Sequence, residues 1–180
     1  VRLGFDFAYA KPAGRMALVG ARIVTMRRDK RDEVIEEGVI VIDGNRIVAV
    51  GPRSGAGAPV VAAGTPVIDV AGKTILPGLV DAHWHGSQGS DRLIPEQNWV
   101  NLANLAYGVT TIHDPSNDTN EIFAAAELQK AGVLVAPRIF STGTILYGAK
   151  GDFKAEIDSK EDALSNLRRL QAAGAVSVKS

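Results

Sequence analysis

The stretch Leu76-Pro-Gly-Leu-Val-Asp-Ala-His-Trp-His85 is a short apolar run that stops at two histidines two positions apart. Successive side chains on a β-strand point to opposite faces, so a strand here would place His83 and His85 on one side, with Cα atoms roughly 6.5 Å apart. Two imidazoles at that spacing can bind one metal ion, with Zn–N distances of about 2.0–2.1 Å. Many strands carry this spacing without a metal, so the pattern by itself also fits a strand end with two exposed or hydrogen-bonded histidines.

The residues before this stretch have the pattern of short β-strands. Five strands are predicted, at 18–25, 34–42, 46–50, 67–70 and 73–76. Asp, Gly and Asn at 43–45 predict a tight hairpin turn, because these residue types accept a positive φ at low cost. Residues 1–16 have no clean period, and we interpret them as a linker or as the end of an upstream domain.

After residue 77 the pattern changes to an alternation of helices and strands. Three helices are predicted at 94–107, 118–132 and 159–174, and the strands that follow them at 109–113, 133–140 and 176–179. Each helix ends at a glycine that is followed directly by an apolar strand, which is typical of tight αβ loops. This alternation predicts an α/β fold with a parallel sheet. About four βα units in this length amount to half of a TIM-type (β/α)₈ barrel, which typically needs ~250 residues.

The run from Val67 through His85 resembles the first barrel strand of the amidohydrolase superfamily, and the likeness extends from Ala17 to the end of the chain. In that superfamily the two histidines bind a catalytic divalent metal at the mouth of a (β/α)₈ barrel, and a small β-sandwich flanks the barrel. The resemblance therefore implies a β-sandwich at 17–76 and the first half of a metal-dependent hydrolase barrel at 77–180.

The same resemblance assigns roles to individual side chains. His83 and His85 would be ligands of the more buried metal, for which zinc is the best-suited ion. Lys179 resembles the lysine that several members carboxylate, so that its carbamate bridges two metal ions, whereas a lone strand-end lysine is by default a surface ammonium. His113 lies where relatives have no metal ligand, and we interpret it as a substrate-rim or buried hydrogen-bonding histidine. Asp81 either orients an imidazole or is purely structural.

The chain also departs from the family's pattern. A complete member has two further histidines and a general-base aspartate on later strands, and we expect these beyond residue 180 of a longer protein. No catalytic residue is therefore assigned here, and no site for an organic cofactor is predicted. Residues 105–116 and 138–144 resemble a subgroup related to imidazolonepropionase and prolidase-like enzymes. In some of these a TolB-like β-propeller precedes the unit, which predicts a periplasmic or otherwise extracytoplasmic parent protein.

Composition excludes several classes of partner. The 180 residues include 20 basic and 20 acidic side chains, and this balance argues against a nucleic-acid or anionic-membrane footprint. The absence of cysteine excludes disulfides and thiolate ligands. No apolar stretch approaches the ~20 residues that a membrane-spanning helix needs.

Trp84 and Trp99 are both predicted to lie in the core.

The leading hypothesis is a fragment of a metal-dependent hydrolase. Metal-activated hydroxide would attack a small-molecule amide, cyclic amide or dipeptide-like C–N bond. The fragment alone is expected to be inactive, because half of the barrel is absent from it. Two alternatives stay open: a non-catalytic binding or structural domain that retains the scaffold, and an oligomer that forms through the open sheet edges.

Overall fold

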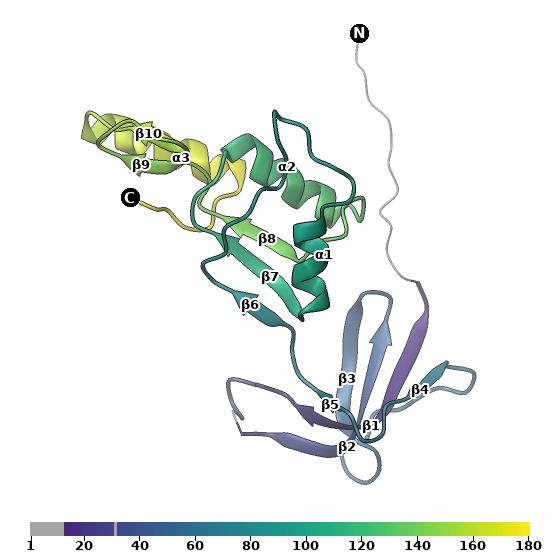
Figure 1. Cartoon of the computed structure of the whole chain (residues 1–180). Helices are drawn as coiled ribbons and strands as arrows, with labels where there is room; N and C mark the ends of the chain where they lie inside the picture. Colours follow the sequence, from purple (N-terminus) through teal and green to yellow (C-terminus); the bar gives the residue numbers. More distant parts are fainter. Residues whose placement is uncertain (1–12, 31) are drawn as a thin grey trace. The chain divides into compact units, whose positions relative to one another are not determined.

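The computed structural model describes residues 13–30 and 32–180, so most of the expected linker at 1–16 lies outside the described residues. The chain divides into two compact units, a smaller one within 11–77 and a larger one within 78–180. Both units contain β-strands, and the helices belong to the larger unit, which makes the protein a mixed α/β chain (Figure 1). Across the described part of the chain, no helix is long and apolar enough to cross a membrane.

The smaller unit is one five-stranded sheet. Its strands are β1 (Arg15–Val24), β2 (Val34–Asp43), β3 (Arg46–Pro52), β4 (Val67–Asp69) and β5 (Thr74–Ile75). The first three strands pair antiparallel, whereas β4 and β5 pair parallel with β1. The predicted hairpin between β2 and β3 is confirmed: Gly44 adopts φ of 58°, in the left-handed region that the turn requires.

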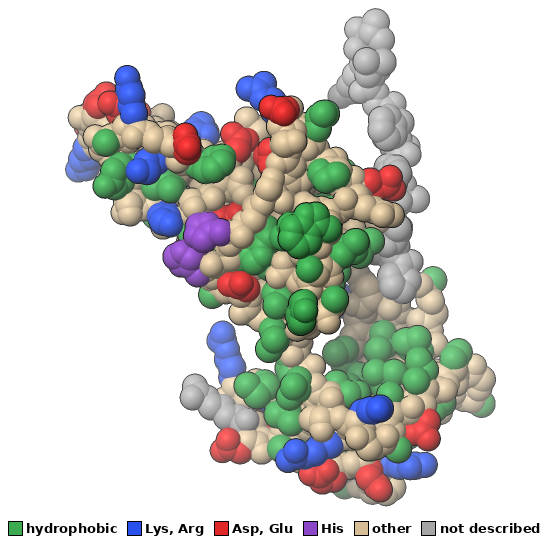
Figure 2. All heavy atoms as spheres, in the orientation of Figure 1, with side chains coloured by type: hydrophobic (Ala, Val, Ile, Leu, Met, Phe, Trp, Pro, Cys, Tyr) green, Lys and Arg blue, Asp and Glu red, His purple; other side chains and the backbone are tan. Residues whose placement is uncertain are grey.

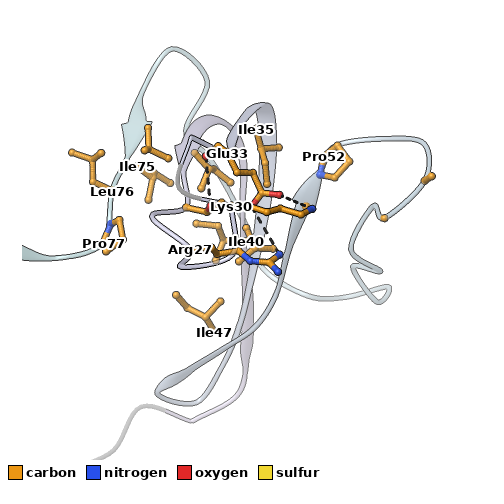
Figure 3. A pocket seen from close by; sticks show the side chains of 17 residues that line it. Arg27, Lys30, Glu33, Ile35, Ile40, Ile47, Pro52, Ile75, Leu76 and Pro77 are labelled. Atoms are coloured by element: carbon orange, nitrogen blue, oxygen red, sulfur yellow. Dashed lines mark hydrogen bonds and ion pairs between the residues drawn. The ribbon is translucent and has the colours of Figure 1, made fainter.

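One face of this sheet is only partly covered. Ala21, Ile23 and Ile40 form its buried core. Beside them a cavity of about 520 Å³ is lined mainly by apolar residues, with Arg27, Lys30 and Glu33 among its lining side chains (Figure 3). Several apolar side chains of this unit are exposed, namely Ile47, Val48, Val50, Val67, Ile68 and Leu76. A second, facing sheet is not present among the residues that the structure describes, so the predicted β-sandwich stays a prediction.

The larger unit is built on a parallel sheet, as the alternation of strands and helices predicts. Its strand order is β6 (Leu79–Asp81), β7 (Val109–Asp114) and β8 (Arg138–Ser141), and both pairings are parallel. Helix α1 (Trp99–Ala106) connects the first pair of strands and α2 (Thr119–Lys130) the second (Figure 1). Two complete βαβ units are therefore present.

The rest of the larger unit corrects the predicted fourth strand. After β8 come the short parallel pair β9 (Ile145–Tyr147) and β10 (Lys154–Glu156), and then α3 (Lys160–Ala173). Residues 176–179 are not a strand. This segment is held by single bonds instead: the Val176 N–H donates to the Ser141 carbonyl at 3.4 Å. The Lys179 carbonyl accepts the Leu146 N–H at 2.9 Å. These isolated bonds to two different strands do not build a ladder, although the segment runs beside the end of β8.

Local capping fixes where the helices begin and end. Asp118 caps α2, because its carboxylate accepts the N–H groups of Asn120 and Glu121. The reciprocal bond of a capping box is absent, since the Asp118 N–H donates to the Asn117 side chain at 2.8 Å and not to the Glu121 carboxylate. Ser159 caps α3. The predicted glycine ends are confirmed by positive φ at the three glycines that follow the helices, namely Gly108, Gly132 and Gly174.

The core of the larger unit lies between the sheet and α2. Ile112 and Ile139 of the sheet pack with Ile122 of α2 and with Trp84, which is 6% exposed. The prediction that Trp84 lies in the core is confirmed. The same prediction for Trp99 is wrong, because this side chain is 77% exposed. Helix α1 begins only at Trp99 and buries Asn101, so its inward face is not the one that apolar periodicity indicates.

Candidate metal and substrate site

The two histidines lie just beyond the end of β6. The strand ends at Asp81, so the prediction that the strand itself carries His83 and His85 is wrong. The Trp84 N–H still donates to the His113 carbonyl at 3.0 Å, so the backbone stays alongside β7. The two imidazoles nevertheless contact each other, with ring centroids 5.1 Å apart and planes inclined by 63°. Histidine side chains gather in one exposed place on the face seen in Figure 2.

The distance between the rings fits a shared metal ion. With Zn–N distances of about 2.0–2.1 Å and tetrahedral angles, two imidazole centroids bound to one zinc lie roughly 5 Å apart. The same distance is ordinary for an edge-to-face contact between two rings, so the spacing permits a metal without requiring one. Among the described residues no group of three or more His, Cys, Asp or Glu side chains is placed to hold a metal. The pair therefore fits as part of a ligand set.

Two roles are expected for Asp81, and its contacts match the purely structural one. Its carboxylate accepts the backbone N–H of His83 at 3.1 Å, which stabilises the turn that follows β6. No bond from Asp81 to an imidazole is recorded in the described part of the chain. The carboxylate nearest to an imidazole comes from β7 instead.

That carboxylate belongs to Asp114, whose side chain is fully buried at the end of β7. Its Oδ1 lies 3.8 Å from Nδ1 of His85. The Ser116 hydroxyl lies 3.4 Å from the same nitrogen. The Ser116 N–H donates to Asp114 Oδ1 at 2.9 Å, and Asn117 donates to Asp114 Oδ2 at 2.8 Å. Asp114 thus contacts both the loop after β7 and the imidazole of His85.

His113 and Lys179 lie farther from this arrangement. Nε2 of His113 is 2.7 Å from the Ser177 hydroxyl, so this half-buried ring connects β7 to the C-terminal segment. The Lys179 carbonyl accepts the Leu146 N–H at 2.9 Å, which fixes the backbone of Lys179 beside β9. No contact between the Lys179 ammonium and the histidine pair is recorded among the described residues. Its role as a ligand stays a prediction.

A cavity of about 450 Å³ opens beside His85. Polar lining groups include Ser87, Ser90, Asp114, Ser116, Asn117 and Glu121. This volume lies in the range of small-molecule sites, about 300–1,000 Å³. Glu121 lines this cavity rather than closing a capping box. The cavity lies at the carboxyl ends of β6 and β7, where parallel α/β proteins place their ligand sites.

Sequence reasoning missed the contributions of Ser116 and Asn117. Both lie in the segment Asp114-Pro-Ser-Asn117, where an Asp two residues before a free backbone N–H is typical of an Asx turn. That local signal predicts the Ser116 N–H bond to Asp114. The approach of this turn to His85 is a contact between distant parts of the chain, which no local pattern predicts.

Curated proteins resemble this chain in sequence. The chain is 27% identical over 172 residues to the imidazolonepropionase of Roseobacter denitrificans, covering 92% of the chain and 42% of the relative. It is 44% identical over 151 residues to the imidazolonepropionase of Alkaliphilus metalliredigens, covering 79% of the chain and 35% of the relative. The chain thus spans well under half the length of these relatives. No protein-family profile matches it.

Two solved structures share the fold. A prolidase complexed with N-methylphosphonate-L-proline superposes with a TM-score of 0.67 at 24% identity, covering 92% of the chain and 46% of the prolidase. An amidohydrolase superposes with a TM-score of 0.61 at 18% identity, again covering 92% of the chain and 46% of the other protein. Identities this low show the fold alone.

Fold and site together define a mixed α/β protein whose polar groups gather where parallel strands end. The curated relatives and the solved structures that share the fold identify the superfamily within this class. The chain belongs to the amidohydrolase superfamily and covers 42% and 35% of the length of the two curated relatives.

Proposed function

We propose that this chain is the N-terminal part of a metal-dependent hydrolase that cleaves C–N bonds of amide, cyclic amide or dipeptide-like substrates. The observation that carries the proposal is the convergence of His83 and His85, with centroids 5.1 Å apart, at the carboxyl ends of parallel strands. The names of the curated relatives, imidazolonepropionases, support an activity on a C–N bond.

The proposal also includes the finer architecture. Residues 77–180 would form the first part of a (β/α)₈ barrel, with β6, β7 and β8 as its first strands. Residues 17–76 would form one layer of a β-sandwich. The open 520 Å³ apolar cavity of the smaller unit supports this, because an uncovered apolar sheet face is stabilised when another layer packs on it.

His83 and His85 would each offer a neutral ring nitrogen to a divalent ion, and zinc suits this ligand type. A bound zinc would lower the pKa of its water and so supply hydroxide near neutral pH. Lys179 would join the site as a carbamate that bridges two ions, once its ammonium has lost its proton and added carbon dioxide. The cavity beside His85 would hold part of the substrate. His113, which is not among the residues that line this cavity, would be a hydrogen-bonding group elsewhere on the substrate rim.

Zinc titration of the 180-residue chain tests the proposal. We expect weak binding, because only part of the ligand set is present, and we expect a loss of at least tenfold in affinity in His83→Ala and in His85→Ala. His113→Ala is the matched control, since it removes the remaining histidine and should leave zinc affinity nearly unchanged. Zinc binding that ignores both substitutions would overturn the assignment. Amide hydrolysis by this chain that survives a chelator would contradict a metal mechanism.

A non-catalytic protein that retains the scaffold is the competing function. Two further histidines and an aspartate at later strand ends of the parent protein favour the enzyme, and their absence would favour the scaffold. Association through open sheet edges and an extracytoplasmic parent stay predictions. Sedimentation over a range of protein concentrations tests the first of them.

A further inference from the structure

Asp114 is an unusual residue to find without solvent exposure. Its side chain is 0% exposed, and burial of a carboxylate is costly unless charge or hydrogen bonds compensate it. In the described ranges, the only ion-pairing group recorded within reach of this carboxylate is the imidazole of His85. A buried acid beside a candidate metal ligand indicates a functional role.

Hydrogen bonds hold this carboxylate in a fixed position. Its Oδ1 accepts the Ser116 N–H at 2.9 Å and its Oδ2 accepts the Asn117 side-chain amide at 2.8 Å. The same Asn117 amide lies 3.3 Å from the Gly86 carbonyl, directly after His85. Asn117 therefore links the Asp114 carboxylate to the backbone directly after His85.

The two ring nitrogens of His85 have different surroundings. Nδ1 faces two oxygen atoms, Oδ1 of Asp114 at 3.8 Å and the Ser116 hydroxyl at 3.4 Å. For Nε2 no protein partner is recorded in the part of the chain that is described. The His85 side chain is 51% exposed, and a movement of roughly 1 Å would bring Nδ1 from 3.8 Å to an ordinary N–H···O distance from Oδ1.

We propose that Asp114 is a positioning residue for His85: its carboxylate accepts the Nδ1 proton and so leaves the Nε2 lone pair for the metal. This inference builds on the proposed metal role of the histidine pair. A carboxylate that fixes the tautomer and the orientation of a metal-binding imidazole increases metal affinity. Asp81, although closer in sequence, is engaged with the His83 backbone and does not take this part.

The tautomer of His85 tests the assignment without any metal. Long-range ¹H–¹⁵N spectra of the metal-free 180-residue chain distinguish Nδ1–H from Nε2–H at about pH 8, above the ordinary histidine pKa of about 6.5. We expect the Nδ1–H form for His85 in the unsubstituted chain. A predominant Nε2–H form would overturn the proposal, and this measurement needs no variant that could fail to fold.

A pair of matched variants sharpens the test. Asp114→Ala should shift His85 towards the Nε2–H form, whereas Asp81→Ala, which removes the other nearby carboxylate, should leave its tautomer unchanged. The backbone amide spectrum reports whether each variant is folded. A folded Asp114→Ala chain that keeps the Nδ1–H form, or an equal shift in Asp81→Ala, would contradict the role of Asp114.

Zinc affinity separates this inference from the proposed function. Asp114→Ala should weaken zinc binding by about 10–100-fold, the usual effect of losing the partner of a metal-binding histidine. Asp81→Ala should have a smaller effect. If the unsubstituted chain binds no zinc, the proposed metal role fails, while the tautomer spectra still decide whether Asp114 orients His85.

Discussion

Gln88 and Asn101 exchange hydrogen bonds between their side-chain amides, and neither side chain is exposed to solvent. Gln88 donates to Asn101 at 3.3 Å, and Asn101 donates to Gln88 at 2.9 Å. A third side-chain amide, that of Asn98, donates to the Ser87 carbonyl at 2.9 Å while Asn98 also caps α1. These bonds attach the loop that follows His85 to α1, so helix and histidine pair are fixed relative to each other.

Replacing one member of this amide pair should destabilise the larger unit. Gln88→Met or Asn101→Leu leaves the other amide buried without a partner, which costs about 1–3 kcal/mol. The double variant should lose less than the sum of the two, because no orphaned amide remains. Urea unfolding followed by tryptophan fluorescence measures this, since both tryptophans, Trp84 and Trp99, lie in the larger unit. If the losses of the two single variants simply add in the double variant, the two amides are not coupled.

Gly86 is required by the indole of Trp84. A Cβ at this position would collide with ring atoms Cζ2 and Cη2 of Trp84, which is buried in the core. Gly86→Ala should therefore cost about 1–3 kcal/mol of unfolding free energy by overpacking. Gly148→Ala is the control, because a Cβ there meets no heavy atom within 4 Å. Equal stability of the two variants in urea would show that the Trp84 contact is not restrictive.

At the start of α2, we expect replacement of Asp118 to lower stability and replacement of Glu121 to have little effect. Asp118→Ala should cost about 0.5–2 kcal/mol, because it removes the acceptor of two helix N–H groups. Glu121→Ala should cost little, since the Asp118 N–H already donates to Asn117. Thermal unfolding followed by circular dichroism compares the two. A similar loss of stability in both variants would indicate that Glu121 does take part in a reciprocal capping box.

The stability of the smaller unit should fall at acidic pH through Glu33. The Thr25 hydroxyl donates to the Glu33 carboxylate at 2.9 Å, and Lys30 lies 3.2 Å from it. These contacts, the Thr25 bond first, hold the pKa of Glu33 below its ordinary value of 4.5. A lowered folded pKa stabilises the fold above the unfolded pKa, and this stabilisation is lost as the pH falls through the folded pKa.

Thr25→Val should accordingly raise the pKa of Glu33 towards 4.5 and reduce the loss of stability in acid. Carboxyl ¹³C shifts followed against pH measure the pKa directly. Thr74→Val is the control, because Thr74 is an exposed threonine of the same unit, and the Glu33 pKa should not respond to it. An unchanged Glu33 pKa in Thr25→Val would assign the shift to the neighbouring cations instead.

Local patterns were sufficient for much of the architecture. The hairpin at Gly44 and the Asp118 cap follow from turn and helix-end chemistry that acts within a few residues. The parallel sheet follows from the alternation of apolar strands with helices that end at glycine. The predictions that failed concern distant contacts. Residues 176–179 have the composition of a strand but not a neighbour that supplies a ladder of hydrogen bonds, and Trp99 lies on a helix whose buried face is formed by Asn101.

The sequence by itself determined that two histidines two positions apart follow a short apolar strand, because both the apolar run and the spacing are read directly from the residues. Only the tertiary structure decided which carboxylate accompanies them. Asp81 is four positions from His85, yet it bonds to a backbone N–H, whereas Asp114 reaches the ring from the next strand. Parallel pairing of β6 with β7 brings these residues together, and pairing between strands far apart in sequence is a contact that no local pattern encodes.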